Sequence, residues 1–294
     1  MEAKIKKAKY ISLSNAVKPE KTDYIERLSG ILAECGTEAT PGDNLYIVRE
    51  SESGYAKERA AELNRLFADE SLDAIFDLSG GDIANEVLTY LDYDMIAKQK
   101  KRFWGFSDLT TVISAIYTKT GKSSMLYQVG MTEYGTEEQP DNYKSYNLGD
   151  GKQLLEYPYK FVRGNKMEGI MVGGNIRCLL KLAGTEYFPD VTNKLLILES
   201  SGGSVPKVIA YINQLCQMGV FNKIAGLVVG NFFCTDDDLT RHPTSAELFL
   251  RYIPEDLPVV KTTWVGHHGG NKGVLIGGYY KYDGDDNMSV EERP

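Results

Sequence analysis

The sequence predicts an α/β protein of two domains, the first of them built on a mostly parallel sheet. Its 294 residues are enough for two domains of ordinary size. Through the first half, short β-branched or aromatic runs alternate with amphipathic stretches in the order β-α-β-α-β-α-β-α. Strands that alternate with helices favour a parallel sheet covered by helices on both faces.

Apolar spacing defines the elements of the first half. Strands are predicted where apolar residues form short runs, and helices where they recur every three or four residues. Gly36 and Gly121 are typical of helix ends. The predicted strands are 10–13, 45–48, 74–78 and 103–106, and the predicted helices are 25–35, 56–67, 83–91 and 109–117.

A stretch of low periodicity separates the two halves. Residues 133–165 are rich in tyrosine, glycine and charge, which predicts a linker or a loop over a cleft. We therefore expect domains at 1–145 and 167–294, joined by a linker at 146–166. The second half contains a glycine-rich helix start at Gly173-Gly174-Asn175, strand 195–198, helix 205–216, strand 225–230 and a frayed acidic tail after Asp283.

Composition excludes several classes of partner. A net charge of −8 disfavours nucleic acid and anionic membranes, because both attract basic patches. No apolar run approaches the roughly 18 residues of a membrane span, and the lysine-rich N-terminus lacks the core of a signal peptide. We expect a cytoplasmic protein with a small-molecule or peptide ligand, and no metal site is complete in the sequence. The separated cysteines are predicted to be small buried hydrophobic residues: Cys35, Cys178, Cys216 and Cys234.

A serine lies between a predicted strand and a predicted helix. In Gly105-Phe106-Ser107-Asp108, Ser107 follows the strand and opens the helix. On a sharp strand-to-helix turn the hydroxyl projects into solvent, and the positive end of the helix stabilises charge that develops nearby. This arrangement is typical of a nucleophile. The alternative is that Ser107 is only the N-cap of the helix, where serine is common.

Two glycines follow the predicted strand 74–78. At the carboxyl end of a strand in an open sheet, glycine lets backbone N–H groups approach a ligand. The N–H of Gly81 is therefore a candidate for one half of an oxyanion hole, and the N–H of Asp108 for the other half. Gly80 and Asp82 are then expected to line the substrate site. A plain tight turn is the alternative.

Histidine is the only side chain whose ordinary pKa lies between about 5 and 8, and the chain has three. His242 precedes a proline in a polar loop and is expected at the surface, whereas His267 and His268 are adjacent in a glycine-rich turn. Glu199 closes the predicted strand 195–198. A carboxylate paired with a histidine orients the ring and stabilises its charged form. A solvated strand end and a structural histidine are the alternatives.

Taken together, these residues resemble the serine peptidase family that contains the LD-carboxypeptidases (muramoyltetrapeptide carboxypeptidases) and the microcin C self-immunity peptidases. The resemblance covers nearly the whole chain as separated motifs in the same order. They are Gly80-Gly81 with Asn85-Glu86 and Leu91-Asp92-Tyr93-Asp94, Gly105-Phe106-Ser107-Asp108-Leu109-Thr110, Gly173-Gly174-Asn175 with Gly184-Thr185-Glu186-Tyr187, Leu196-Ile197-Leu198-Glu199, and Gly266-His267 with Asn271.

The resemblance implies roles for three side chains. Ser107 matches the family's nucleophile, Glu199 the carboxylate of its triad, and His267, directly after the glycine of a Gly-His element, its general base. It also implies a Rossmann-like N-terminal domain bearing the serine and a smaller, mixed α/β C-terminal domain bearing the other two residues. The active site would lie between the domains of a metal-free enzyme without a cofactor, usually a homodimer.

Departures from the family pattern leave the substrate open. Ser79-Gly80-Gly81-Asp82 is closer to the immunity branch, and Ser200 follows Glu199 where an acidic residue is common. One candidate substrate is a murein tetrapeptide, which would lose its terminal D-alanine. The other is an aminoacyl nucleotide, cleaved at its amide, and it calls for an aromatic surface that stacks on the base. The candidates for that surface are Trp104, Tyr134, Tyr143 and Tyr146. A catalytically silent relative that binds a ligand between its domains is a third hypothesis.

Overall fold

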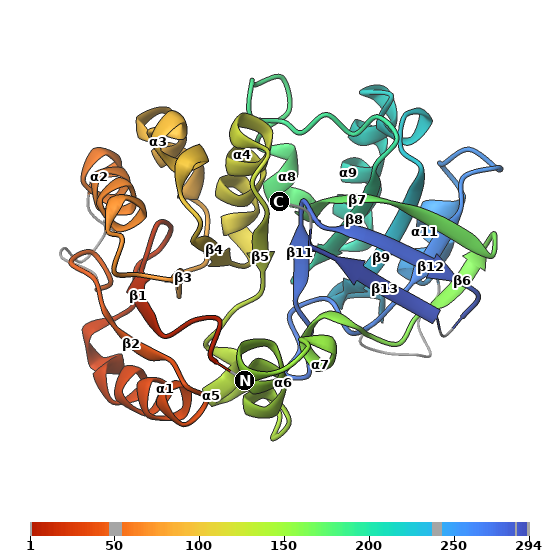
Figure 1. Cartoon of the computed structure of the whole chain (residues 1–294). Coiled ribbons are helices and arrows are strands. Elements are labelled where there is room, and N and C mark those ends of the chain that lie inside the picture. Colours follow the sequence, from red (N-terminus) through yellow and green to blue (C-terminus); the bar gives the residue numbers. More distant parts are fainter. Residues whose placement is uncertain (1, 47–54, 237–242, 286, 293–294) are drawn as a thin grey trace.

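The computed structural model describes residues 2–46, 55–236, 243–285 and 287–292, and it contains two β-sheets side by side (Figure 1). Parallel strands make up the first sheet except at one edge, where β11 is antiparallel to β5. The strand order of this sheet is β11 (Val274–Ile276), β5 (Ser124–Leu126), β4 (Arg102–Gly105), β3 (Ala74–Asp77), β1 (Lys7–Ile11) and β2 (Glu38–Pro41).

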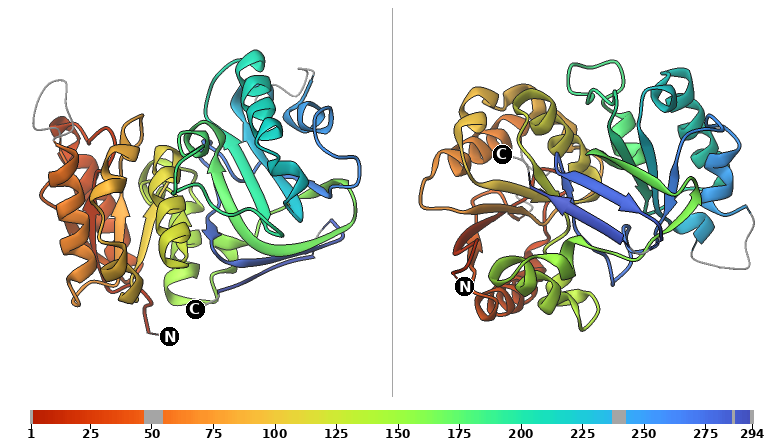
Figure 2. Two further views of the ribbon diagram at one scale, coloured as in Figure 1. Left: turned by 90° about the horizontal axis from the view of Figure 1, so that it is seen from above. Right: turned by 45° about the vertical axis from the view of Figure 1, so that its right-hand side comes forward.

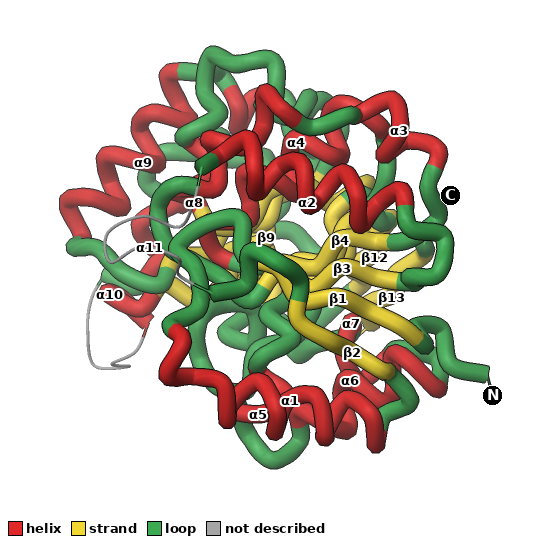
Figure 3. Tube along the Cα trace, turned by 90° about the vertical axis from the view of Figure 1, so that its left-hand side faces the viewer, coloured by secondary structure: helices red, strands yellow, loops and turns green. Residues whose placement is uncertain are grey.

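Helices cover both faces of the first sheet (Figure 3). One face carries α2 (Ala56–Ala68), α3 (Tyr93–Lys98) and α4 (Thr110–Thr120), and the other carries α1 (Thr22–Glu34), α5 (Met131–Tyr134) and α6 (Gln139–Leu148). Three short 3₁₀ helices, η1 (Pro19–Lys21), η2 (Ala84–Tyr90) and η3 (Ser107–Leu109), complete this N-terminal unit. Because both faces are covered, β3 is buried along its whole length.

The second sheet forms the C-terminal unit. Its strand order is β13 (Asn287–Glu291), β12 (Tyr279–Asp283), β7 (Lys166–Asn175), β8 (Leu195–Ser200), β9 (Gly226–Phe232), β10 (Val259–Lys261) and β6 (Lys160–Arg163). Its four central strands, β7 to β10, are parallel, and the outer strands are antiparallel. The associated helices are α8 (Ile176–Leu180), α9 (Val205–Gln217), η4 (Val220–Asn222), α10 (Phe233–Asp236) and α11 (Ser245–Leu250), whereas the short helix α7 (Lys152–Leu155) packs against α6 of the N-terminal unit.

Strand β8 shows how the two units are joined. Leu195 and Ile197 pack into a core that continues into the N-terminal unit, whereas Leu196 and Leu198 pack into a second core that includes residues of α9. Successive side chains of a strand point to opposite faces, so a continuous apolar run requires two covered faces. Figure 2 shows the units packed against one another, and the shared core keeps the strand ends of both sheets near one seam.

The predicted α/β class with a parallel N-terminal sheet is confirmed, but one strand lies elsewhere. The second strand is Glu38–Pro41, not 45–48, and Ile47 and Val48 lie outside the described residues. Strand β2 is an edge strand that buries only Ala39, so it has no apolar run to reveal it. His242 also lies outside the described residues. The predicted helix 83–91 is the 3₁₀ helix η2.

The described residues of the predicted linker, 146–166, and of the predicted frayed tail form helices and strands. Residues 146–148 end α6, α7 follows, and β6 pairs with β10 in the second sheet. The tail forms β13, which pairs with β12 through residue 291. Strand β11 returns from the second half to the first sheet. Strands β6 and β13 are held by backbone pairing with distant strands, and neither buries a continuous apolar run that would reveal it in the sequence.

The cysteines are only partly as predicted. Cys35 and Cys178 are buried, whereas Cys216 and Cys234 are half-buried. Within the described ranges, no helix is both long enough and apolar enough to cross a membrane.

Candidate active site

Ser107 occupies a strained turn between β4 and α4. Its φ of 57° lies in the left-handed region, which a residue other than glycine adopts only when the surrounding structure holds it there. Gly105 makes the turn possible, because a Cβ at that position would lie 2.7 Å from the Cβ of Leu109. The Ser107 side chain caps neither η3 nor α4. The N-cap alternative is therefore excluded, and the geometry is that of a nucleophile elbow.

Glu199 and His267 form a partly buried pair at the end of β8. Glu199 is fully buried, and its Oε2 lies 2.7 Å from Nδ1 of His267. Nε2 of His267 is also buried, and no described residue, Ser107 included, hydrogen-bonds to it. The His267 ring packs on Phe106, the residue before Ser107, with 4.8 Å between ring centroids. All three predicted triad residues thus lie at the seam between the units.

Asn175 links the two units beside this pair. Its Nδ2 donates to Oε1 of Glu199 at 2.9 Å, and its backbone N–H donates to Oγ1 of Thr110 at 3.0 Å. It also caps α8, since its Oδ1 accepts from the backbone N–H of Cys178. From the sequence, Asn175 was named only as part of a helix start and of a family motif, and it was given no role in the site. The Gly-Gly-Asn sequence at a strand end was the available signal.

Gly174 lets the units approach one another at this seam. Its φ is +135°, and a Cβ there would lie 2.6 Å from Oγ1 of Thr110. We expect Gly174→Ala to lower the free energy of unfolding by at least about 2 kcal/mol, through backbone strain and overpacking. Urea unfolding measures the change. Gly30→Ala is the control, because Gly30 lies in α1 with open space around it. This variant should raise the free energy of unfolding by about 0.5–1 kcal/mol. A Gly174→Ala protein as stable as the parent would contradict this account of the seam.

The loop after β3 holds Gly81, one of the two predicted oxyanion residues, whereas the other, Asp108, lies in η3 after β4. Gly81 has φ +137°, and a Cβ there would clash with the Asn15 side chain. Asn15 also donates its backbone N–H to the carbonyl of Gly80 at 3.2 Å. Within the described part of the chain, no residue accepts a hydrogen bond from the N–H of Gly81 or of Asp108. The Asp82 carboxylate, by contrast, is paired with Arg177.

A buried acid, Asp77, supports this loop from below. Its oxygens accept from the backbone N–H of Ser79 at 2.7 Å and of Leu13 at 2.8 Å. Burial is the main cause that raises the pKa of Asp77 to about 7, and Asp108 nearby adds to it. Because the folded-state pKa exceeds the ordinary value of 3.8, the stability that this group contributes is complete below pH 3.8 and is lost as the pH rises through about 7.

We therefore expect Asp77→Asn to flatten the pH dependence of stability. The difference in the free energy of unfolding between the variant and the parent should favour the variant more at pH 8 than at pH 5. The reason is that asparagine carries no charge to bury. Urea midpoints at the two pH values measure this difference. The exposed Asp73→Asn, which changes another acid next to β3, is the control. An equal stability difference at both pH values would contradict the assignment.

Comparison with known proteins identifies the family. The LD-carboxypeptidase N-terminal domain matches residues 9–127, and the LD-carboxypeptidase C-terminal domain matches residues 168–281. A probable murein peptide carboxypeptidase of Bacillus subtilis is 30% identical over 260 residues, which cover 84% of this chain and 80% of that protein. The chain belongs to the LD-carboxypeptidase family. The family consists of serine hydrolases, and the predicted resemblance is confirmed.

The immunity branch of this family is also similar. The microcin C7 self-immunity protein MccF of Escherichia coli is 28% identical over 212 residues, which cover 60% of this chain and 61% of that protein's length. A structure of MccF in complex with glutamyl sulfamoyl guanosine has a TM-score of 0.86 at 22% identity and covers 98% of this chain and 96% of that one. A muramoyltetrapeptide carboxypeptidase from Oxalobacter formigenes has a TM-score of 0.79 at 22% identity, with 98% and 99% covered. Both structures share the fold of this LD-carboxypeptidase family member.

Trp104 does not line the site, so its predicted stacking role is wrong. Its side chain is 1% exposed and packs edge-on against neighbouring aromatic rings in the core. Those rings belong to Phe76, Tyr127, Tyr143 and Tyr146. Alternate residues of β4 point to opposite faces of the sheet, and Trp104 points to the face covered by α6. Of the aromatic residues predicted for this role, only Tyr134 is exposed.

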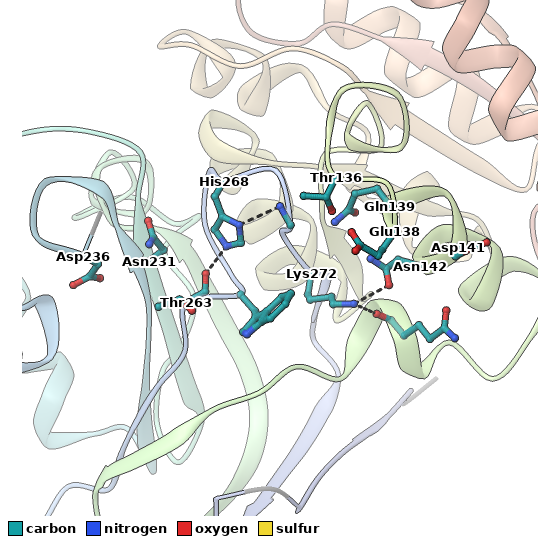
Figure 4. Close-up of a pocket in the computed structure, with 13 residues that line it drawn as sticks. Thr136, Glu138, Gln139, Asp141, Asn142, Asn231, Asp236, Thr263, His268 and Lys272 are labelled. Carbon is teal, nitrogen blue, oxygen red and sulfur yellow. Dashed lines mark hydrogen bonds between the residues drawn. The ribbon is translucent and has the colours of Figure 1, made fainter. Parts of the chain in front are cut away.

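His268 differs from His267 in its contacts. Its Nε2 bonds to the carbonyl of Thr263, and its Nδ1 accepts from the N–H of Gly270 at 3.1 Å, so both ring nitrogens serve the turn. Figure 4 shows His268 beside a cavity of about 880 Å³ between this turn and the start of α6. The described triad residues do not line this cavity, but the Trp264 ring, 38% exposed, does. Sequence reasoning missed Trp264, although it lies three residues before His267.

Proposed function

We propose that this LD-carboxypeptidase family member cleaves an LD-amide bond of a murein tetrapeptide and releases the terminal D-alanine. The contact between Glu199 and His267 carries the proposal. A buried carboxylate that binds Nδ1 places the ring proton there and leaves Nε2 able to accept a proton. Ser107, in its strained turn after the carboxyl end of β4 in the neighbouring sheet, is the nucleophile that acts with this pair.

In this mechanism Ser107 Oγ attacks the carbonyl carbon of the scissile amide and passes its proton to Nε2 of His267. The carbonyl oxygen becomes an oxyanion, which the N–H groups of Gly81 and Asp108 stabilise. The intermediate collapses as the C–N bond breaks, and His267 returns the proton to the leaving amine of D-alanine. Water, activated by His267, then hydrolyses the acyl-enzyme and restores Ser107. The Glu199 carboxylate holds the His267 ring in place and stabilises its charged form.

A second candidate is cleavage of the amide between an aminoacyl group and a nucleotide analogue. The exposed rings of Trp264 and Tyr134 favour it, because aromatic faces stack on nucleobases. Solved structures of MccF contain glutamyl sulfamoyl guanosine and aspartyl sulfamoyl adenosine. The triad would act in the same way on this substrate.

One experiment distinguishes these reactions. The purified protein is incubated with L-Ala-D-Glu-meso-diaminopimelate-D-Ala and, separately, with an aminoacyl sulfamoyl adenosine, and the products are identified by mass spectrometry. Free D-alanine supports the first reaction, and free sulfamoyl adenosine supports the second. If neither product forms while a ligand is retained, the protein is a catalytically silent relative and both reactions are excluded.

The proposal also includes a cytoplasmic homodimer. Light scattering of the purified protein at micromolar concentration should give twice the 32.8 kDa mass of the chain. A mass of one chain at that concentration would contradict the dimer.

A further inference from the structure

Two basic side chains of the C-terminal unit reach across the seam to the predicted oxyanion hole. Arg177 lies in α8, and Lys181 follows four residues later on the same side of the helix. Nη2 of Arg177 donates to the carbonyl of Gly81 at 2.9 Å, and Nη1 pairs with the Asp82 carboxylate. Nζ of Lys181 donates to the carbonyl of Asp82 at 2.8 Å and forms an ion pair with Asp108.

The ion pair between Lys181 and Asp108 is largely buried. The Asp108 side chain is 0% exposed and that of Lys181 is 20% exposed. The other oxygen of Asp108 accepts from Oγ of Ser14 at 2.7 Å and from the N–H of Ala84 at 2.8 Å. Donors from three separate segments therefore hold the residue whose N–H forms half of the predicted hole. A buried carboxylate that loses its cation must find other partners or move.

Arg177 acts on the other half of the hole. Its side chain and that of Asp82 are 39% and 67% exposed, so their ion pair contributes little to stability by itself. The bond to the Gly81 carbonyl matters for another reason. Gly81 lacks a Cβ that would limit its backbone angles, so its peptide groups need an external restraint. Asn15 packs on one side of Gly81, and Arg177 holds the carbonyl.

We propose that Arg177 and Lys181 are positioning residues that keep the N–H groups of Gly81 and Asp108 aimed at the oxyanion. The inference rests on the proposed function, which assigns those two N–H groups. Helices α4 and α8 lie side by side at the seam (Figure 1). Through Arg177 and Lys181 the C-terminal unit would thus order the loop of Gly81 and the turn of Asp108 in the N-terminal unit. Oxyanion donors lower a barrier only if they are oriented before the reaction begins. Loosening them should reduce kcat and leave substrate binding unchanged.

The kinetic test compares Arg177→Met and Lys181→Met with a matched control. Each variant should lower kcat about tenfold, and the double variant about a hundredfold, with KM within twofold of the parent, because a loosened donor costs less than a deleted one. Lys181→Arg, which keeps the charge, should recover kcat to within about threefold. The control is Lys119→Met, which breaks the ion pair of Lys119 with Glu186 across the same two units and should leave kcat unchanged.

A second measurement does not depend on any substrate. Hydrogen exchange of backbone amides in residues 79–84 should quicken at least tenfold in Arg177→Met and Lys181→Met, and stay unchanged in Lys119→Met. The inference would be overturned if the two variants exchanged this segment as slowly as the parent protein or kept its kcat. A raised KM at constant kcat would also overturn it. If the parent protein cleaves neither candidate substrate, the proposed function fails, and the exchange result alone still supports or overturns the restraint by α8.

Discussion

Replacing Ser107 by alanine should lower kcat for D-alanine release by about 10⁶, comparable with the removal of a whole triad. The reason is that the acyl-enzyme cannot form without the hydroxyl that the strained turn presents. Product release by the purified variant, followed by mass spectrometry over hours, measures the loss. The fold should persist, because the Ser107 side chain caps neither adjoining helix.

Ser114→Ala is the matched control for this variant. Ser114 lies two turns further along in α4, is buried, and its Oγ has no hydrogen-bond partner among the described residues. Its replacement should leave kcat unchanged. If Ser107→Ala retained more than a tenth of the parental kcat, Ser107 would not be the nucleophile, and the proposed mechanism would have to be abandoned.

Glu199→Gln should lower kcat by about 10⁴, the size of effect known when the acid of a serine protease triad becomes an amide. Oε2 of Glu199 accepts from Nδ1 of His267, and Oε1 accepts from Nδ2 of Asn175. An amide can present an oxygen to only one of these donors, so His267 would take the wrong tautomer or Asn175 would lose its bond. The fold should survive, since a neutral amide is cheaper to bury than an unpaired charge.

The same assay of D-alanine release tests this change. Glu186→Gln alters an exposed carboxylate of the same unit and should retain the parental kcat. A Glu199→Gln protein with more than a tenth of the parental kcat would show that the carboxylate does not orient the base.

The local sequence pattern was sufficient to predict a residue's role wherever that role depends on the immediate neighbours in the chain. Ser107 was recognisable because an apolar strand precedes it and a helix follows, and Glu199 because it closes a continuous apolar run. Both faces of β8 are buried, and this produces the run. Strand β2 escaped prediction for the opposite reason, since an edge strand is held by backbone bonds that leave no apolar pattern.

The direction of a side chain escaped prediction where it depends on a covered face. Trp104 lies three residues before Ser107, which suggested a place beside the substrate, yet its ring points into the core under α6. In a strand, one residue more or less changes the face, so proximity in sequence says little about a shared site.

The sequence by itself determined the α/β class, the strand-to-helix turn that contains Ser107 and the apolar strand that leads to Glu199, because each follows from short-range periodicity and from glycine's backbone freedom. Only the tertiary structure decided that His267 meets Glu199, that Asn175 bridges the units, and that Arg177 and Lys181 reach the loop of Gly81. These contacts join residues dozens of positions apart, and burial of two apolar sheet faces in one core, rather than any local pattern, brings them together.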